Sequence, residues 1–170
     1  VVITLISLLA TIVMVSLNSA RTKSKDARRL EDLSQIQKAL ELYYHDNSQY
    51  PPINAARTSN TTCGVNWCVL ETALAPYLSK LPIDPLGLQN NYIYYYDSDS
   101  GDNYQTYGMM IRLEYSGNYS LATNDGGYNG YRNSGQYYEI GTQPPYCNDK
   151  YNGNNRNWWG NQITVCVGGN

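Results

Sequence analysis

The chain has 170 residues, of which 42% are hydrophobic and 15% charged, and its formal net charge at pH 7 is −2. This composition fits one globular domain with an appendage. Residues 21–29 hold five of the twelve basic side chains and one acidic one, so residues 30–170 are mildly acidic. That balance argues against nucleic acid as the chief partner, because phosphate binding needs a clustered basic face.

Residues 1–17 form an apolar run, and no charged residue or proline precedes Arg21. The run is at the short end for a membrane-spanning helix, which needs about 20 residues. The apolar core of a secretory signal is shorter than this and follows a basic flank, and neither property holds here. The pattern predicts a helical segment that must be surrounded by lipid or by other apolar helices.

Hydroxyl side chains within this run fall on one side of the expected helix, at Thr4, Ser7 and Thr11. Two interpretations are open. Small hydroxyl residues often mark the place where a second helix packs closely. Alternatively, they are tolerated because they can bond to the backbone of their own helix.

From residue 27 the apolar positions become one-sided and recur at three- and four-residue steps, which is the spacing of one helix face. No glycine or proline interrupts residues 1–50, and Tyr50-Pro51-Pro52 ends the pattern. We therefore predict one helix of about 46 residues, roughly 69 Å long. The expected apolar face consists of Ala27, Leu30, Leu33, Ile36, Leu40 and Tyr43 or Tyr44, with Glu31, Asp32, Gln35, Lys38 and Glu41 on the other faces.

We expect three parts: an apolar helix half at 1–26, an amphipathic half at 27–52, and a β-rich head at 53–170. The stretch "VLETALAPYLSKL" predicts a short helix broken by Pro76. Aromatic and β-branched segments separated by Gly, Asn, Asp and Ser predict an antiparallel sheet of four to six strands packed on the helix. The fold class is therefore α+β. The candidate strands are 91–97, 103–115, 118–124, 136–141 and 162–167.

Four cysteines, Cys63, Cys68, Cys147 and Cys166, permit three disulfide pairings. We favour Cys63 with Cys68 and Cys147 with Cys166, so that the last pair holds the loop at 147–162. An even count beside an apolar N-terminal segment suggests an oxidising compartment. A zinc site is less favoured, because the cysteine spacing differs from a metal knuckle and the chain has a single histidine.

The helix, a segment after it and a later turn together resemble one family. These segments are "SLLATIVMVSLNSARTKSKDARRLEDLSQIQKALELYYHDNSQYPP", "LPIDPLGLQNNYIYYY" and "YSLATNDGG". They resemble type IV pilins and the pseudopilins of type II secretion. The resemblance implies a long N-terminal helix packed on a small antiparallel head with disulfide-stapled loops. It also implies an inner-membrane precursor, trimmed by a prepilin peptidase and stacked into helical filaments.

Family members begin with an aromatic residue and carry a glutamate near the fifth mature position. This sequence begins at Val1, and its first acidic residue is Asp26. We therefore expect that about seven residues precede the sequence in the family's numbering.

The resemblance predicts first a major pilin, the structural subunit of an extracellular type IV pilus-like filament. The alternatives are a pseudopilin of a type II secretion or DNA-uptake machine, and a membrane-anchored adhesin or glycan-binding domain. Expected partners are copies of the same chain, the inner membrane before assembly, and the pilus assembly machinery. The expected filament-core residues are Thr4, Ser7, Leu8, Thr11, Ile12 and Met14.

The basic cluster at 21–29 lies where the expected helix leaves lipid. It can meet anionic headgroups, or it can pair with acidic residues of neighbouring subunits. The sequence leaves both interpretations open.

Calcium is the metal for which the sequence offers candidates. Asp97, Asp99 and Asp102 resemble the alternating oxygen ligands of a calcium loop, but Glu114 lies too far along for that loop. The resemblance to calcium-binding pseudopilins adds Asp125, and a solvated acidic turn is the favoured alternative at each place.

We expect no required cofactor and no enzymatic activity. The sequence has no Gly-x-Ser-x-Gly, no phosphate loop and no pair of histidines. His45 is expected to be a surface residue.

Overall fold

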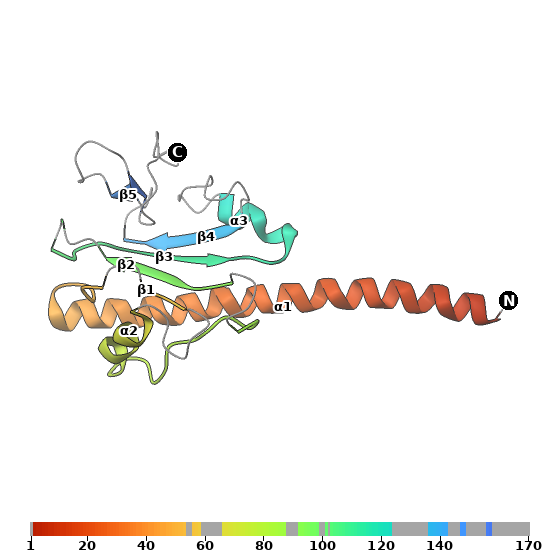
Figure 1. The fold of residues 1–170 in the computed structure, drawn as a ribbon, viewed down its shortest axis with the longest axis horizontal. Helices are drawn as coiled ribbons and strands as arrows, with labels where there is room; N and C mark the ends of the chain where they lie inside the picture. Colours follow the sequence, from red (N-terminus) through yellow and green to blue (C-terminus); the bar gives the residue numbers. More distant parts are fainter. Residues whose placement is uncertain are drawn as a thin grey trace.

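The fold was analysed in a computed structural model, in which one long helix carries a small head near its C-terminal end (Figure 1). The head packs along part of α1, and the N-terminal part of α1 projects beyond it. The structure describes residues 2–53, 56–58, 66–87, 92–98, 101, 103–123, 136–142, 147–148 and 156–157.

Helix α1 runs without a break over Val2–Asn47, 46 residues, which confirms the predicted length. It ends where Ser48 adopts a positive φ of 57° and its N–H donates to the Tyr44 carbonyl at 2.7 Å. This left-handed residue stops the helix three residues before Pro51. The division of the helix into an exposed half and a packed half follows from which residues the head covers.

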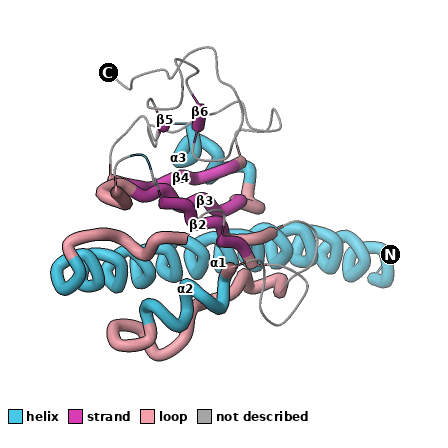
Figure 2. The backbone as a smooth tube through the Cα atoms, turned by 60° about the vertical axis from the view of Figure 1, so that its left-hand side comes forward, coloured by secondary structure: helices cyan, strands magenta, loops and turns pink. Residues whose placement is uncertain are grey.

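The head is built on an antiparallel sheet of four strands in the order β1-β2-β3-β4. The sheet is a simple meander, because each strand pairs with the next one in the chain. Figure 2 shows α1 running alongside this sheet, with α2 (Trp67–Leu74) beside α1. The strands are β1 (Ala56–Arg57), β2 (Tyr95–Ser98), β3 (Tyr107–Arg112) and β4 (Tyr137–Gly141), and a second ladder pairs β5 (Cys147–Asn148) with β6 (Arg156–Asn157).

The core lies between the amphipathic half of α1 and one face of the sheet. Alternate residues of β3 (Tyr107, Met109 and Ile111) enter it, as the two-residue period of a strand requires. Tyrosine takes the place that phenylalanine often holds, and the chain has no phenylalanine. The fully or nearly buried core residues include Leu33, Ile36, Leu40, Leu70, Leu74, Tyr94 and Tyr96.

Two predictions about the helix face were wrong. Ala27 is exposed, although the three- and four-residue spacing placed it on the apolar face. Asp32, expected on a solvent face, is 8% exposed, and Asp26 and Arg29 are fully buried. The reason is that this turn of α1 lies under a polar part of the head, so its buried side is charged rather than apolar.

The strand expected at 118–124 was also wrong, because this stretch forms the short helices η2 (Ser116–Asn118) and α3 (Tyr119–Thr123). The Asn118 N–H bonds to the Tyr115 carbonyl at 2.9 Å, so a local turn takes the backbone group that a ladder would need. The other strand predictions within the described residues were confirmed, with shorter bounds. The two-residue strand β1 was missed, since it has too few residues to show a period.

Several predictions fall outside the described residues or are only partly covered. Cys68, on α2, takes part in a disulfide bond, but the pairing of the four cysteines stays a prediction. Cys147 belongs to β5. The predicted features outside the described residues are Cys63, Cys166, Asp99, Asp102, Asp125 and the strand at 162–167.

Candidate assembly site

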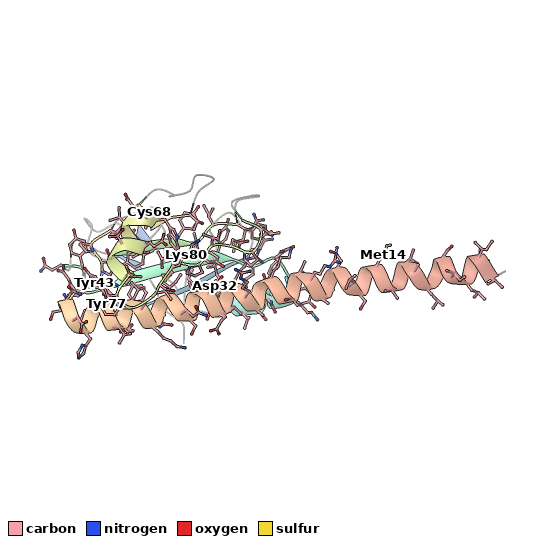
Figure 3. The ribbon with its side chains drawn as sticks, turned by 90° about the horizontal axis from the view of Figure 1, so that it is seen from below. Met14, Asp32, Tyr43, Cys68, Tyr77 and Lys80 are labelled. Carbon is pink, nitrogen blue, oxygen red and sulfur yellow. The ribbon has the colours of Figure 1, made fainter. Side chains whose placement is uncertain are left out.

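The N-terminal half of α1 exposes its apolar side chains to solvent. An 18-residue window of α1 has a mean hydropathy of 2.1, and none of the residues described in it is buried within the chain. By length and composition α1 can therefore cross a membrane. Figure 3 shows Met14 on the bare part of the helix and Asp32 on the part that the head covers. The large apolar side chains exposed here, by 48 to 81%, are Val2, Ile3, Leu5, Ile6, Leu9, Val13, Met14 and Leu17.

The hydroxyl stripe bonds to its own helix. Ser7 Oγ donates to the Ile3 carbonyl at 2.9 Å, and Thr11 Oγ1 donates to the Ser7 carbonyl at 3.3 Å. This is the second of the two interpretations, since the hydroxyls are satisfied before any partner arrives. Close helix packing on the same stripe stays a prediction. The backbone of Leu8 and Ile12 is helical, and their side chains lie outside the described residues.

Where the exposed half meets the head, five charged residues form a cluster that we call the charged joint: Lys25, Asp26, Arg29, Asp84 and Glu114. The Arg29 guanidinium donates to both carboxylate oxygens of Asp84, at 2.6 and 2.9 Å, and to Asp26 at 2.7 Å. Lys25 Nζ lies 2.7 Å from Glu114, and Arg29 lies 3.5 Å from the same carboxylate. The fork geometry and complete burial of Arg29 make this the strong kind of ion pair.

Asp26 connects the charged joint to the loop that follows β3. Its carboxylate accepts the backbone N–H groups of Glu114 at 2.8 Å and Tyr115 at 2.9 Å, and the Asn118 side-chain amide at 3.0 Å. With Arg29, four donors converge on one fully buried carboxylate. The loop after β3 is thereby attached to α1 at one helical turn.

Asp84 supplies the second attachment, from the segment "DPLG". Its Oδ1 accepts the Leu86 N–H at 2.8 Å, and its carbonyl accepts the Gly87 N–H at 2.7 Å. Pro85 suits the second position of such a turn, and Gly87 adopts the positive φ of 67° that favours glycine. The turn thus presents the Asp84 carboxylate to Arg29 in a fixed orientation.

Burial by itself lowers the pKa of Arg29, but the hydrogen bonds and charges of Asp84 and Asp26 outweigh it and leave this pKa above its ordinary value. The Tyr92 ring lies between two guanidinium groups, with its centroid 4.6 Å from Arg29 and 4.9 Å from Arg112. Arg29 is therefore charged at neutral pH.

Acidic side chains on α1 and from distant parts of the chain offset much of the positive charge of the basic cluster at 21–29. Lys25 and Arg29 pair within the charged joint, and Arg28 lies 3.9 Å from Asp32. Lys23 Nζ lies 4.7 Å from the centroid of the Tyr115 ring. The local excess of positive charge in the sequence is thus smaller in the fold. This difference could not be seen in sequence, because Asp84 and Glu114 lie more than 50 residues away.

Sequence reasoning missed the charged joint as a site. Two signals pointed to it: the oppositely charged pair Asp26 and Arg29, three residues apart on one helix face, and the aspartate that opens "DPLG". Neither signal shows that Asp84 lies opposite the pair of Asp26 and Arg29 in the fold.

The structure does not test the calcium prediction. Of the four candidates only Asp97 is described; it lies in β2, half-buried and paired with Gly108 of β3. Within the described ranges, no group of three His, Cys, Asp or Glu side chains is placed to hold a metal ion. His45 is exposed, with Nδ1 2.9 Å from Asp46.

The comparisons with known proteins agree with this architecture. The sequence profile of the family "type II secretion system (T2SS), protein G" matches residues 13–109, which include the second part of the exposed half, the packed half and the head as far as β3. The chain belongs to the protein G family of type II secretion systems. The predicted resemblance to pilins and pseudopilins is confirmed.

One relative of this protein G family member is the type II secretion system core protein G of Vibrio cholerae serotype O1. The two chains are 29% identical over 101 residues, which is 59% of this chain and 68% of the relative. No solved structure matches the chain significantly. The family match covers Arg29 and Asp84 but stops before Glu114 and the loop that Asp26 holds.

Asp32 and Tyr94 form a second buried polar contact in this protein G family member, and it makes stability depend on pH. Tyr94 Oη donates to Asp32 Oδ2 at 2.8 Å. Burial raises the pKa of Asp32 above its ordinary value of 3.8, against the opposing effects of the Tyr94 hydrogen bond and of Arg28. A carboxyl whose pKa is higher in the folded state binds its proton more tightly there. Its protonation therefore favours folding, and this contribution is lost as pH rises.

We expect the unfolding free energy of the unmodified chain, minus that of Asp32→Asn, to fall as pH rises through the range just above 3.8. Urea unfolding of the full chain in detergent at several pH values measures this difference. The same difference measured between Tyr94→Phe and the double variant Tyr94→Phe/Asp32→Asn should fall more steeply with pH. The reason is that the Tyr94 hydrogen bond, which lowers the pKa of Asp32, is then absent. A difference that rises with pH would show that Asp32 is stabilised as the carboxylate.

Proposed function

We propose that this chain is the repeating subunit of a pseudopilus in a type II secretion machine, assembled through residues 2–20 of α1. The observation that carries the proposal is the apolar 18-residue window of α1, in which the head buries none of the described residues. Family membership supports the choice of machine. Such a segment needs lipid before assembly and other copies afterwards, so the subunit begins as an inner-membrane precursor.

The proposed assembly follows from the shape of the subunit, which is one long helix with a head on part of it. Head-to-tail contacts that do not close into a ring generate an open helix of subunits. The apolar halves exclude water together, at about 25 cal/mol per Å² of apolar surface buried. Relative to lipid the gain from burial is small, so close packing between helices has to hold the bundle. The charged joint supports this role, because it holds each head at a defined place on its helix.

An extracellular type IV pilus is the second candidate function. The observation that favours it is the length of chain beyond the family match. Residues 110–170 contain eight of the 18 tyrosines and two of the three tryptophans. Aromatic side chains are what a long surface fibre would need for adhesion to glycans, because aromatic rings stack on sugars. In either case we propose no catalytic role, and calcium binding remains a proposal.

Deletion of this chain's gene tests the two candidates against each other. For a pseudopilin, proteins secreted by the type II machine should accumulate in the periplasm, while sheared surface fibres stay unchanged. For a major pilin, secretion should be normal and the fibres should disappear from negative-stain micrographs. Normal secretion together with normal fibres would contradict both candidates.

A further inference from the structure

An open groove of about 820 Å³ lies where the exposed half of α1 meets the head. One wall is helical and includes Met14, Leu17 and Arg21. The other wall is the loop after β3, including Glu114 and Tyr115. The Asp26 carboxylate accepts two backbone N–H groups of this loop, those of Glu114 and Tyr115, and so holds the wall of the groove in place.

The groove changes character along the helix. Met14 and Leu17, at the end toward the N-terminus, are 71% and 48% exposed. Arg21 lies seven residues beyond Met14, about 10 Å along the axis of an α-helix. The apolar run ends at Leu17, and Arg21 is the first charged residue after it. In a bilayer, the Met14 end would therefore lie among acyl chains and the Arg21 end among headgroups.

The charge that faces the groove is positive. Glu114 lines the groove, but Lys25 lies 2.7 Å from its carboxylate and offsets its charge. Arg21 is exposed, and its side chain makes no ion pair or hydrogen bond with any residue that the structure describes. The groove therefore has an available guanidinium above an apolar surface, the arrangement that suits a phosphate group above an acyl chain.

We propose that this groove binds an anionic phospholipid of the bilayer while the subunit is membrane-anchored. Arg21 binds the phosphate, and Met14 and Leu17 contact the upper part of the acyl chain. The site requires α1 to lie in a membrane, and it does not depend on which filament the subunit later joins. Of the two interpretations of the basic cluster, this one assigns Arg21 to the headgroup.

Native mass spectrometry of the full chain, released from nanodiscs of nine parts phosphatidylcholine and one part phosphatidylglycerol, tests the proposal. We expect phosphatidylglycerol among the retained lipids to be enriched about fivefold over its share of the disc, as one surface-facing basic residue would produce. Arg21→Gln should remove the enrichment. The fold should persist in this variant, because the Arg21 side chain is exposed and makes no ion pair or hydrogen bond with a described residue of the head.

Lys23→Gln is the matched control. It removes the same charge two residues away, from a side chain that does not line the groove, and it should retain the enrichment. Equal losses in the two variants, or no enrichment in the unmodified chain, would overturn the proposal. Inorganic phosphate added at millimolar concentration should leave the enrichment unchanged, and displacement by it would also overturn the assignment to a bilayer lipid. Failure of the chain to enter nanodiscs at all would instead overturn its membrane anchoring.

Discussion

Replacing Arg29 by methionine should destabilise the head by about 3–5 kcal/mol, because Asp26 and Asp84 would keep their buried charges without a partner. The guanidinium is fully buried and binds two carboxylates, Asp26 on the same helix and Asp84 from a distant segment. A loss of this size is a large part of the 5–15 kcal/mol that stabilises a typical domain. Guanidinium chloride unfolding of the full chain in detergent, followed by the near-UV circular dichroism of the aromatic head, measures it.

Arg28→Met is the matched control for this change. Its side chain is 62% exposed and lies 3.9 Å from Asp32, so the variant should lose less than about 1 kcal/mol. In the double variant Arg29→Met/Asp84→Asn the loss should be smaller than the sum of the single losses, since the unpaired charge is then partly removed. Asparagine at this position keeps an oxygen that can accept the Leu86 N–H. Additive losses would mean that Arg29 and Asp84 do not act as a pair.

Replacing Leu9 by arginine should prevent both membrane insertion and filament assembly. Leu9 is 62% exposed near the middle of the apolar half, where nothing in the chain covers it. An arginine at the centre of a spanning helix costs about 2.5–3.5 kcal/mol, or on the order of 100-fold in the insertion equilibrium. The same charge would have to be desolvated among packed helices in a filament. Flotation with liposomes and negative-stain microscopy of assembled material measure the two effects.

Leu121→Arg is the control for the same chemical change. Leu121 is 44% exposed on α3, away from the apolar half of α1, so insertion should be unchanged. The head of the Leu9→Arg variant should unfold at the same denaturant concentration as the unmodified chain, because Leu9 is exposed and does not belong to the core of the described residues. Normal flotation and normal fibres in Leu9→Arg would contradict the proposed role of residues 2–20.

The sequence alone predicted α1 and most of the sheet. These features depend on local properties: an apolar run, a three- and four-residue period, and prolines after residue 50. Leu33, Ile36 and Leu40 are buried as their spacing predicted. The short helix α2 and strands β2, β3 and β4 were also visible, because each carries its own run of aromatic or apolar residues.

The tertiary structure decided where the charges go. Sequence reasoning assigned the basic cluster at 21–29 to lipid headgroups or to neighbouring subunits. In the fold, Arg29 and Asp26 are buried instead, because Asp84 and the loop after β3 lie opposite them. A charged residue has no local pattern that tells whether it meets water or a distant partner. Burial of such a group is favourable only when the partner is present, and the partner's position depends on the whole fold. For the same reason, only the fold shows that Arg21 is the basic side chain that lines the groove.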